Sequence, residues 1–203
     1  DYEDSLLIAS AIRLHTLLEV KDHENTYDGE TVDFLRDTMP FPQENGEPSI
    51  NTAYYITEDF LTKDIPEGGD DLINDILTNK EMFDDDIRDA TIIAIRDVWE
   101  EYPEYAFMAS EKRIDTLLDV ASDDKESEIN REDSLDALDF VAIENPKALA
   151  GKKASRLLSI NGNPKTPKSI SDSASEVLDR LDIDVEAMRP QDARQGSSAS
   201  PGP

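Results

Sequence analysis

The sequence predicts an all-α protein of about eight or nine helices, and three observations support this fold class. Apolar residues recur at the three- and four-residue spacing of a helix face along most of the chain, whereas the alternation typical of strands is absent. Prolines, glycines and short polar segments interrupt this pattern at intervals that fit ordinary helix lengths. One helical unit also recurs further along the chain, which indicates a repeat architecture.

Two helices are predicted before residue 40. The first begins at Asp4 or Ser5, ends near Lys21 and carries a single apolar face, formed by Leu7, Ala11, Leu14 and Leu18. The second is shorter, contains Val32, Phe34 and Leu35, and ends before Pro40 and Pro42.

Two more helices are predicted between residues 49 and 78. Ser49 is the expected N-cap of the first, whose apolar side consists of Ile50, Ala53, Tyr54, Phe60 and Leu61. The segment 66–69, Pro-Glu-Gly-Gly, ends it. The other helix presents Leu72, Ile73, Ile76 and Leu77. The acidic run Asp84–Asp86 that follows is typical of a helix start, where negative charge favours the helix dipole.

The second half of the chain contains the repeat. Residues 88–106 align with residues 131–149 at an offset of 43, so that Arg88 corresponds to Arg131, Ala94 to Ala137 and Pro103 to Pro146. Each proline is followed by a second helical segment, around Leu117 in the first unit and around Leu157 in the second. Two helices per unit with a period in the forties indicate a helical solenoid. A last helix, with Val177, Leu178 and Leu181, is expected to cover the open end.

The two units resemble HEAT-type (armadillo-like) helical repeats over about residues 84–160. The marks are an arginine near the start of the first helix, small alanines and a closing proline: Arg88, Ala90, Ala94 and Pro103, then Arg131, Ala137, Asn145 and Pro146. The resemblance implies a right-handed α-solenoid, with residues 1–80 as degenerate helix pairs or a cap and residues 81–189 as HEAT-like repeats with a C-terminal capping helix. Residues 190–203, rich in proline, glycine and serine, are predicted to be a disordered tail.

Several large or small apolar residues have predicted packing roles within this stack. Ala94 and Ala137 should let adjacent helices approach closely, because their side chains are short. Trp99, Phe107 and Met108 are expected to fill the gaps between repeats, since aromatic residues at helical spacing are mostly buried.

The chain is strongly acidic, with 47 Asp and Glu against 20 Lys and Arg in 203 residues and a formal charge of −27. Such a charge disfavours binding to nucleic acid or anionic membranes. Because the acids are dispersed along the chain, they favour a solvated surface of haloarchaeal type, adapted to a salt-rich cytosol, over a dedicated face for a cationic partner. The absence of cysteine and of a long apolar run fits a cytoplasmic protein.

The sequence offers no recognisable catalytic, metal or cofactor site, and a non-enzymatic function is predicted. His15 and His23 are the only histidines and stand apart, whereas zinc or nucleophilic sites need convergent ligands. The aspartate clusters lack the glycine turn and terminal glutamate of a calcium loop. The Asp1 start is typical of a processed chain or of a fragment of a longer repeat protein.

One segment, residues 145–171, contains no Asp or Glu and is the predicted partner-binding region. It carries six cations: Lys147, Lys152, Lys153, Arg156, Lys165 and Lys168. Three interpretations stay open. The cations neutralise neighbouring acidic helices, dock an acidic protein or a second copy of the chain, or contact a phosphate backbone as in HEAT-like DNA glycosylases. An interaction or adaptor module is the preferred function, with nucleic-acid binding as the alternative.

Overall fold

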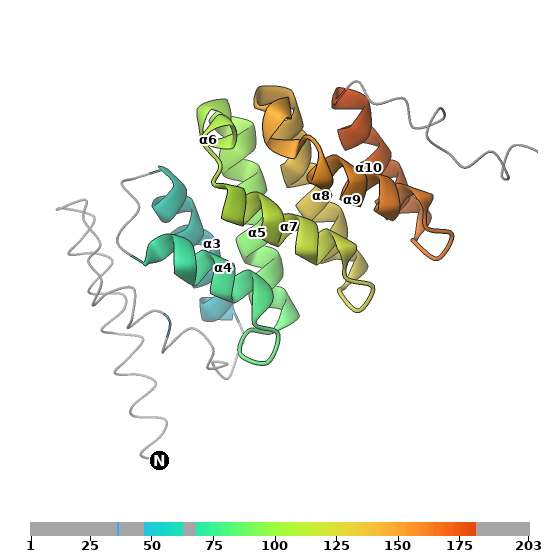
Figure 1. Ribbon diagram of the computed structural model, residues 1–203. Helices are drawn as coiled ribbons and strands as arrows, with labels where there is room; N and C mark the ends of the chain where they lie inside the picture. The colour runs from blue at the N-terminus through green and yellow to red at the C-terminus, as the bar shows by residue number, and fades with distance from the viewer. Residues whose placement is uncertain (1–35, 37–46, 63–67, 182–203) are drawn as a thin grey trace, which may run out of the picture.

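The computed structural model describes residue 36 and residues 47–62 and 68–181 (Figure 1). Within these ranges every regular element is a helix: α3 (Glu47–Thr62), α4 (Gly69–Thr78), α5 (Asp85–Glu101), α6 (Pro103–Phe107), α7 (Glu111–Ser122), α8 (Glu128–Glu144), the 3-10 helix η1 (Pro146–Leu149), α9 (Lys152–Gly162) and α10 (Lys168–Arg180). The all-α class is therefore confirmed over the described residues. The helices predicted before residue 40 and the predicted tail 190–203 lie outside them.

The helices form two layers (Figure 1). In one layer α3 packs on α5, α5 on α8, and α8 on α10. In the other layer α4 packs on α7 and α7 on α9, while α6 and η1 connect the layers. Each long helix presents an apolar stripe that a single helix pair could not cover, so stacking of neighbouring pairs buries it.

One continuous core runs through the described residues, from Ala53 in α3 to Leu178 in α10. The sequence predicts a boundary at residue 80, and the described segments on both sides of it share this core. Ala94 in α5 and Ala137 in α8 are fully buried, and Trp99 is 1% exposed, which confirms its predicted place in the core. Phe107 and Met108 were predicted to be buried, and this is wrong, because they are 57% and 62% exposed. They stand at the end of the five-residue helix α6, where the chain turns towards α7.

Helix starts follow local capping chemistry. The side chains of Asp84, Ser110 and Ser127 each accept a hydrogen bond from the backbone N–H three residues on, at 2.9, 3.2 and 3.1 Å. Ser49 does not cap α3, because that helix already begins at Glu47. Pro48 is compatible with this earlier start, since the first turn has no use for the N–H that proline lacks.

Contacts between successive helix pairs span the same interval as the sequence repeat. The Tyr54 hydroxyl donates to Asp97 at 3.0 Å, and the Tyr105 hydroxyl donates to the Thr62 carbonyl at 3.0 Å, each across 43 residues. In the other layer, the Thr116 hydroxyl contacts the buried Asn74 amide oxygen at 3.0 Å. The helix pair α3–α4 therefore stacks on the next unit, although its sequence lacks the repeat marks.

Candidate functional site

Two loops of equal length and similar structure join the layers, one between α7 and α8 and the other between α9 and α10. Asp123 and Asn163 directly follow the preceding helix, and each accepts a hydrogen bond at 3.0 Å from the backbone N–H two residues on. In each loop the backbone N–H three residues on also returns to their carbonyl oxygen, at 3.1 and 3.0 Å. These matching turns make Glu126 and Thr166, the residues just before the N-caps Ser127 and Pro167, equivalent positions.

In α5, α8 and α10, which are neighbours in one layer, the fourth residue after the N-cap donates a hydrogen bond to the end of the preceding helix. In α5 and α8 it is a buried arginine, and the Nε of Arg88 and Arg131 donates to the carbonyls of Leu77 and Ala121 at 3.2 and 3.1 Å. In α10 it is Ser171, whose hydroxyl donates to the Asn161 carbonyl at 3.1 Å. Each side chain thereby satisfies a carbonyl at the end of the preceding helix, where intrahelical partners run out.

Arg88 completes its hydrogen bonds with the carboxylate of the next loop. Its Nη1 lies 2.9 Å from Glu126 Oε1, and its Nη2 contacts the other carboxylate oxygen. Lys80 and Asn130 also donate to Glu126, at 2.7 and 2.9 Å. Burial by itself raises the pKa of the Glu126 carboxyl, but the hydrogen bonds from Arg88, Lys80 and Asn130 outweigh it and lower the pKa to about 2.

Arg131 stands in the same place one unit later, and the residue equivalent to Glu126 there is Thr166, which lines the same pocket as Arg131. Arg131 is 6% exposed, and the hydrogen bond to Ala121 satisfies only Nε. Within the described residues it has no ion pair. Arg131 lines this pocket of about 420 Å³ together with residues of α7, α9 and the two loops: Ser122, Asp124, Ser155, Arg156, Ser159, Ile160, Asn163, Lys165 and Thr166.

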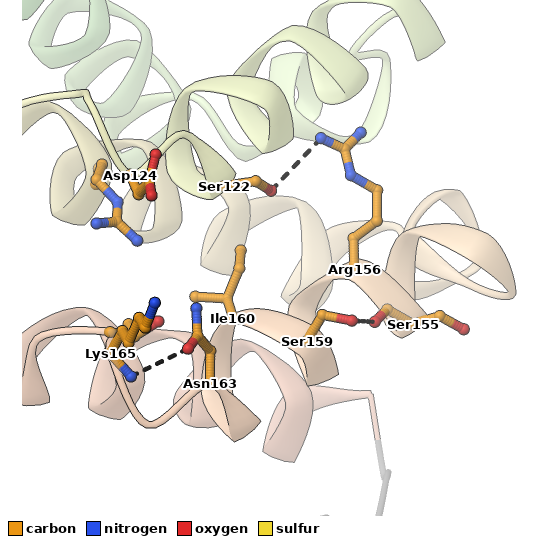
Figure 2. Close-up of a pocket in the computed structure, with 10 residues that line it drawn as sticks. Ser122, Asp124, Ser155, Arg156, Ser159, Ile160, Asn163 and Lys165 are labelled. Atoms are coloured by element: carbon orange, nitrogen blue, oxygen red, sulfur yellow. Dashed lines mark hydrogen bonds between the residues drawn. The ribbon is translucent and has the colours of Figure 1, made fainter.

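Figure 2 shows how most of these residues surround the pocket. Arg156 extends from α9 towards α7, where its Nη2 lies 3.5 Å from the Ser122 hydroxyl and 2.5 Å from Asp119. Ser159 and Ser155 lie along α9, with the Ser159 hydroxyl donating to the Ser155 carbonyl at 2.9 Å. Cations, hydroxyls and one amide thus dominate the lining, and Asp124 is its one acid.

The structure divides the six predicted site residues. Arg156 and Lys165 line the pocket. Three of the six pair with carboxylates of the same chain: Arg156 with Asp119, Lys153 with Asp115 at 3.8 Å, and Lys168 with Asp172 at 2.8 Å. Lys147, Lys152 and Lys165 are exposed and have no ion pair among the described residues. Pairing within the chain thus accounts for half of the set, with the neighbouring helix α7 for Arg156 and Lys153 and within α10 itself for Lys168.

Sequence reasoning missed Arg131 and Thr166 as site residues. From the sequence, Arg131 is identified only as a mark of the repeat. Its alignment with Arg88 is the one signal that could have drawn attention to it. Thr166 could not be found from the same alignment. The N-caps Asp84 and Ser127 are 43 residues apart, whereas Asp123 and Asn163, which follow α7 and α9, are 40 apart. An offset of 43 therefore pairs Glu126 with Ser169 instead of Thr166.

The described residues hold no group of three or more metal-ligating side chains. His15 and His23 lie outside them. In the same part of the chain, no helix combines the length and apolar character needed to cross a membrane.

Comparisons of the chain with models of known protein families, with curated proteins and with solved structures found no match.

Proposed function

We propose that this protein is a non-enzymatic protein-binding module that receives an acidic partner on the face formed by α9 and its flanking loops. The observation that carries the proposal is the pocket between the two loops, lined by Arg131, Arg156 and Lys165, of which only Arg156 has an ion pair among the described residues. The chain carries a formal charge of −27, so most of its surface repels negatively charged groups. A local cluster of cations attracts such groups instead.

The scaffold of this module is, in our proposal, a right-handed HEAT-like α-solenoid in a salt-rich cytosol. The two helical layers and the contacts across 43 residues support the repeat assignment. A stack of this kind presents its helices as a rigid surface, so partner binding needs little reorganisation of the module. The dispersed acids support the salt-adapted setting, because high salt screens their mutual repulsion.

Nucleic-acid binding is the weaker alternative. Binding to a phosphate backbone draws on a broad basic field, in which several cations each contact a phosphate. Three of the six cations in residues 145–171 are already paired with carboxylates, and Asp124 stands within the pocket. The field that remains is narrow, which fits a few acidic side chains better than a polyanion.

A matched pair of charge reversals tests the proposal. Lys147 and Lys152 are changed to Glu in one variant, and Lys112 and Arg180, exposed cations on α7 and α10 outside the pocket lining and its two loops, are changed to Glu in the other. Both variants gain the same negative charge. Affinity capture from a high-salt lysate, followed by mass spectrometry, should lose its specific protein partner only in the first variant.

Retention of the same partner by both variants contradicts the proposal. Capture of DNA or RNA by the wild type at high salt, lost only in the Lys147 and Lys152 variant, would instead establish the nucleic-acid alternative.

A further inference from the structure

We propose that the pocket beside Arg131 is a receptor for a carboxylate group, and that it binds an Asp or Glu side chain of the partner protein. This inference rests on the proposed function in so far as the carboxylate belongs to a protein. The pocket's affinity for a carboxylate is a separate property that follows from its own geometry.

The preceding unit of the same chain provides the template. There the guanidinium of Arg88 binds a carboxylate side by side, with Nη1 at 2.9 Å from one oxygen of Glu126 and Nη2 on the other. Planar guanidinium and carboxylate groups match in this arrangement, which gives two parallel charge-assisted hydrogen bonds. Arg88 is held for this purpose by its bond to the Leu77 carbonyl.

Arg131 repeats the template without the carboxylate. Its Nε is fixed to the Ala121 carbonyl just as that of Arg88 is fixed to Leu77, so the guanidinium is anchored before any ligand arrives. Thr166, in the position of Glu126, offers a hydroxyl where the earlier unit offers a carboxylate. Arg131 is 6% exposed as a residue and lines the pocket, so a carboxylate that enters the pocket would form charge-assisted hydrogen bonds that are partly shielded from solvent.

The other residues that line the pocket favour a carboxylate that is part of a larger molecule. Lys165 and Arg156 add positive charge, and the hydroxyls of Ser155 and Ser159 add polar partners. Asp124 opposes a second negative charge, which favours a monoanionic carboxylate over a phosphate dianion. A volume of about 420 Å³ exceeds one carboxylate and leaves room for the residues beside it, with Ile160 as apolar contact.

The decisive variant installs the missing carboxylate on the protein itself. Thr166→Glu places an acidic side chain where Glu126 stands in the earlier unit, and it should occupy Arg131 and block the pocket. Ser169→Glu is the matched control, because it adds the same charge three residues away at an exposed position that does not line the pocket.

Binding is followed by NMR on the full chain, through the Nε–H signal of Arg131 and the methyl signals of Ile160. The probes are acetate, a capped pentapeptide with one central Glu among alanines, the same peptide with Gln, and inorganic phosphate. We expect saturable shifts with acetate and with the Glu peptide, tighter binding of the peptide, and no saturable shift with the Gln peptide. Thr166→Glu should weaken carboxylate binding at least tenfold, whereas Ser169→Glu should change it less than twofold. The Nε–H signal of Arg88, already paired with Glu126, should stay in place throughout.

The outcomes separate this inference from the proposed function. Equal binding by Thr166→Glu and Ser169→Glu, no saturable carboxylate binding, or tighter binding of phosphate than of the Glu peptide each overturns the carboxylate receptor. Binding of acetate without any preference for the Glu peptide overturns the assignment to a protein side chain and points to a free small carboxylate. Specific peptide binding upholds the receptor even where affinity capture finds no partner, in which case the proposed function alone fails.

Discussion

Replacing Glu126 by glutamine tests how strongly the buried ion network between successive units stabilises the fold. Glutamine keeps the shape of the side chain but removes its charge and turns one acceptor oxygen into an NH2 donor. The Arg88 guanidinium, which is fully buried, would then keep only the Leu77 carbonyl and the exposed Asp85 carboxylate as hydrogen-bond partners of full strength.

Two considerations give the magnitude of this loss. Removing one partner of a buried ion pair costs about 3–5 kcal/mol, because the other charge stays buried without compensation. The pKa of the Glu126 carboxyl falls from 4.5 to about 2 on folding, which at about 1.4 kcal/mol per tenfold change in proton affinity corresponds to about 3 kcal/mol. The side chain is 1% exposed, so solvent screening reduces this value little. We therefore expect Glu126→Gln to lower the free energy of unfolding by about 3 kcal/mol at pH 7.

The sign of the pH dependence follows from the lowered pKa. A carboxyl that binds protons less tightly in the folded state stabilises the fold fully above its unfolded pKa of about 4.5, and this contribution is lost as the pH falls towards 2. The difference between wild type and Glu126→Gln should thus shrink steadily between pH 5 and pH 2.

Urea denaturation in KCl, followed by Trp99 fluorescence at pH 7 and pH 3, measures both effects. Asp123→Asn is the matched control. It also removes a carboxylate that contacts Lys80, at 2.7 Å, but this ion pair is partly exposed and should contribute less than about 1 kcal/mol. If Glu126→Gln lost no more stability than Asp123→Asn at pH 7, the argument from burial would be refuted.

Three further predictions concern other parts of the fold. Burial, then the nearby carboxylates of Asp133 and Asp86, raise the pKa of Asp89 from 3.8 to about 6, so its contribution to stability is fully present below about pH 4 and is lost as the pH rises through 6. Asp89→Asn should accordingly raise the free energy of unfolding by about 1–2 kcal/mol at pH 7.5, discounted for partial exposure, and leave it unchanged near pH 4, and equal stability at pH 7.5 would contradict this. In the same urea assay, followed by circular dichroism, Trp99→Ala should cost about 3–5 kcal/mol and Phe107→Ala less than about 0.5 kcal/mol, since only Trp99 is buried; similar losses would contradict the packing. The melting temperature should rise between low and multimolar KCl, because salt screens the charge of −27, and a constant value would exclude the salt-adapted interpretation.

Much of the helical architecture could be predicted because its signals are local. Apolar spacing identified the helices around Ile73, Leu117 and Leu157, and the acidic run Asp84–Asp86 identified the start of α5. The alignment of Arg88 with Arg131 located equivalent buried positions. The errors fall at segment ends, where competing signals stand close together: Ser49 next to Pro48 at the start of α3, and the exposed Phe107 at the end of α6.

The candidate site was only half visible for a different reason. The sequence by itself determined that residues 145–171 are free of acids and rich in cations, because composition needs no coordinates. Only the tertiary structure decided which cations find partners, since Arg156 meets Asp119 on α7, 37 residues away.

The same holds for the two buried arginines, which the sequence makes equivalent. Stacking brings Glu126 to Arg88 across 38 residues, whereas the shorter connection between α8 and α9 brings Thr166 to the corresponding place beside Arg131. The spacing of apolar residues along a helix is a property of the sequence and can be read without the structure. The matching of charges between units depends on which residues the stacked loops bring together. The position equivalent to Glu126 is Thr166, which has no carboxylate to pair with Arg131, and only the structure shows that these two positions correspond.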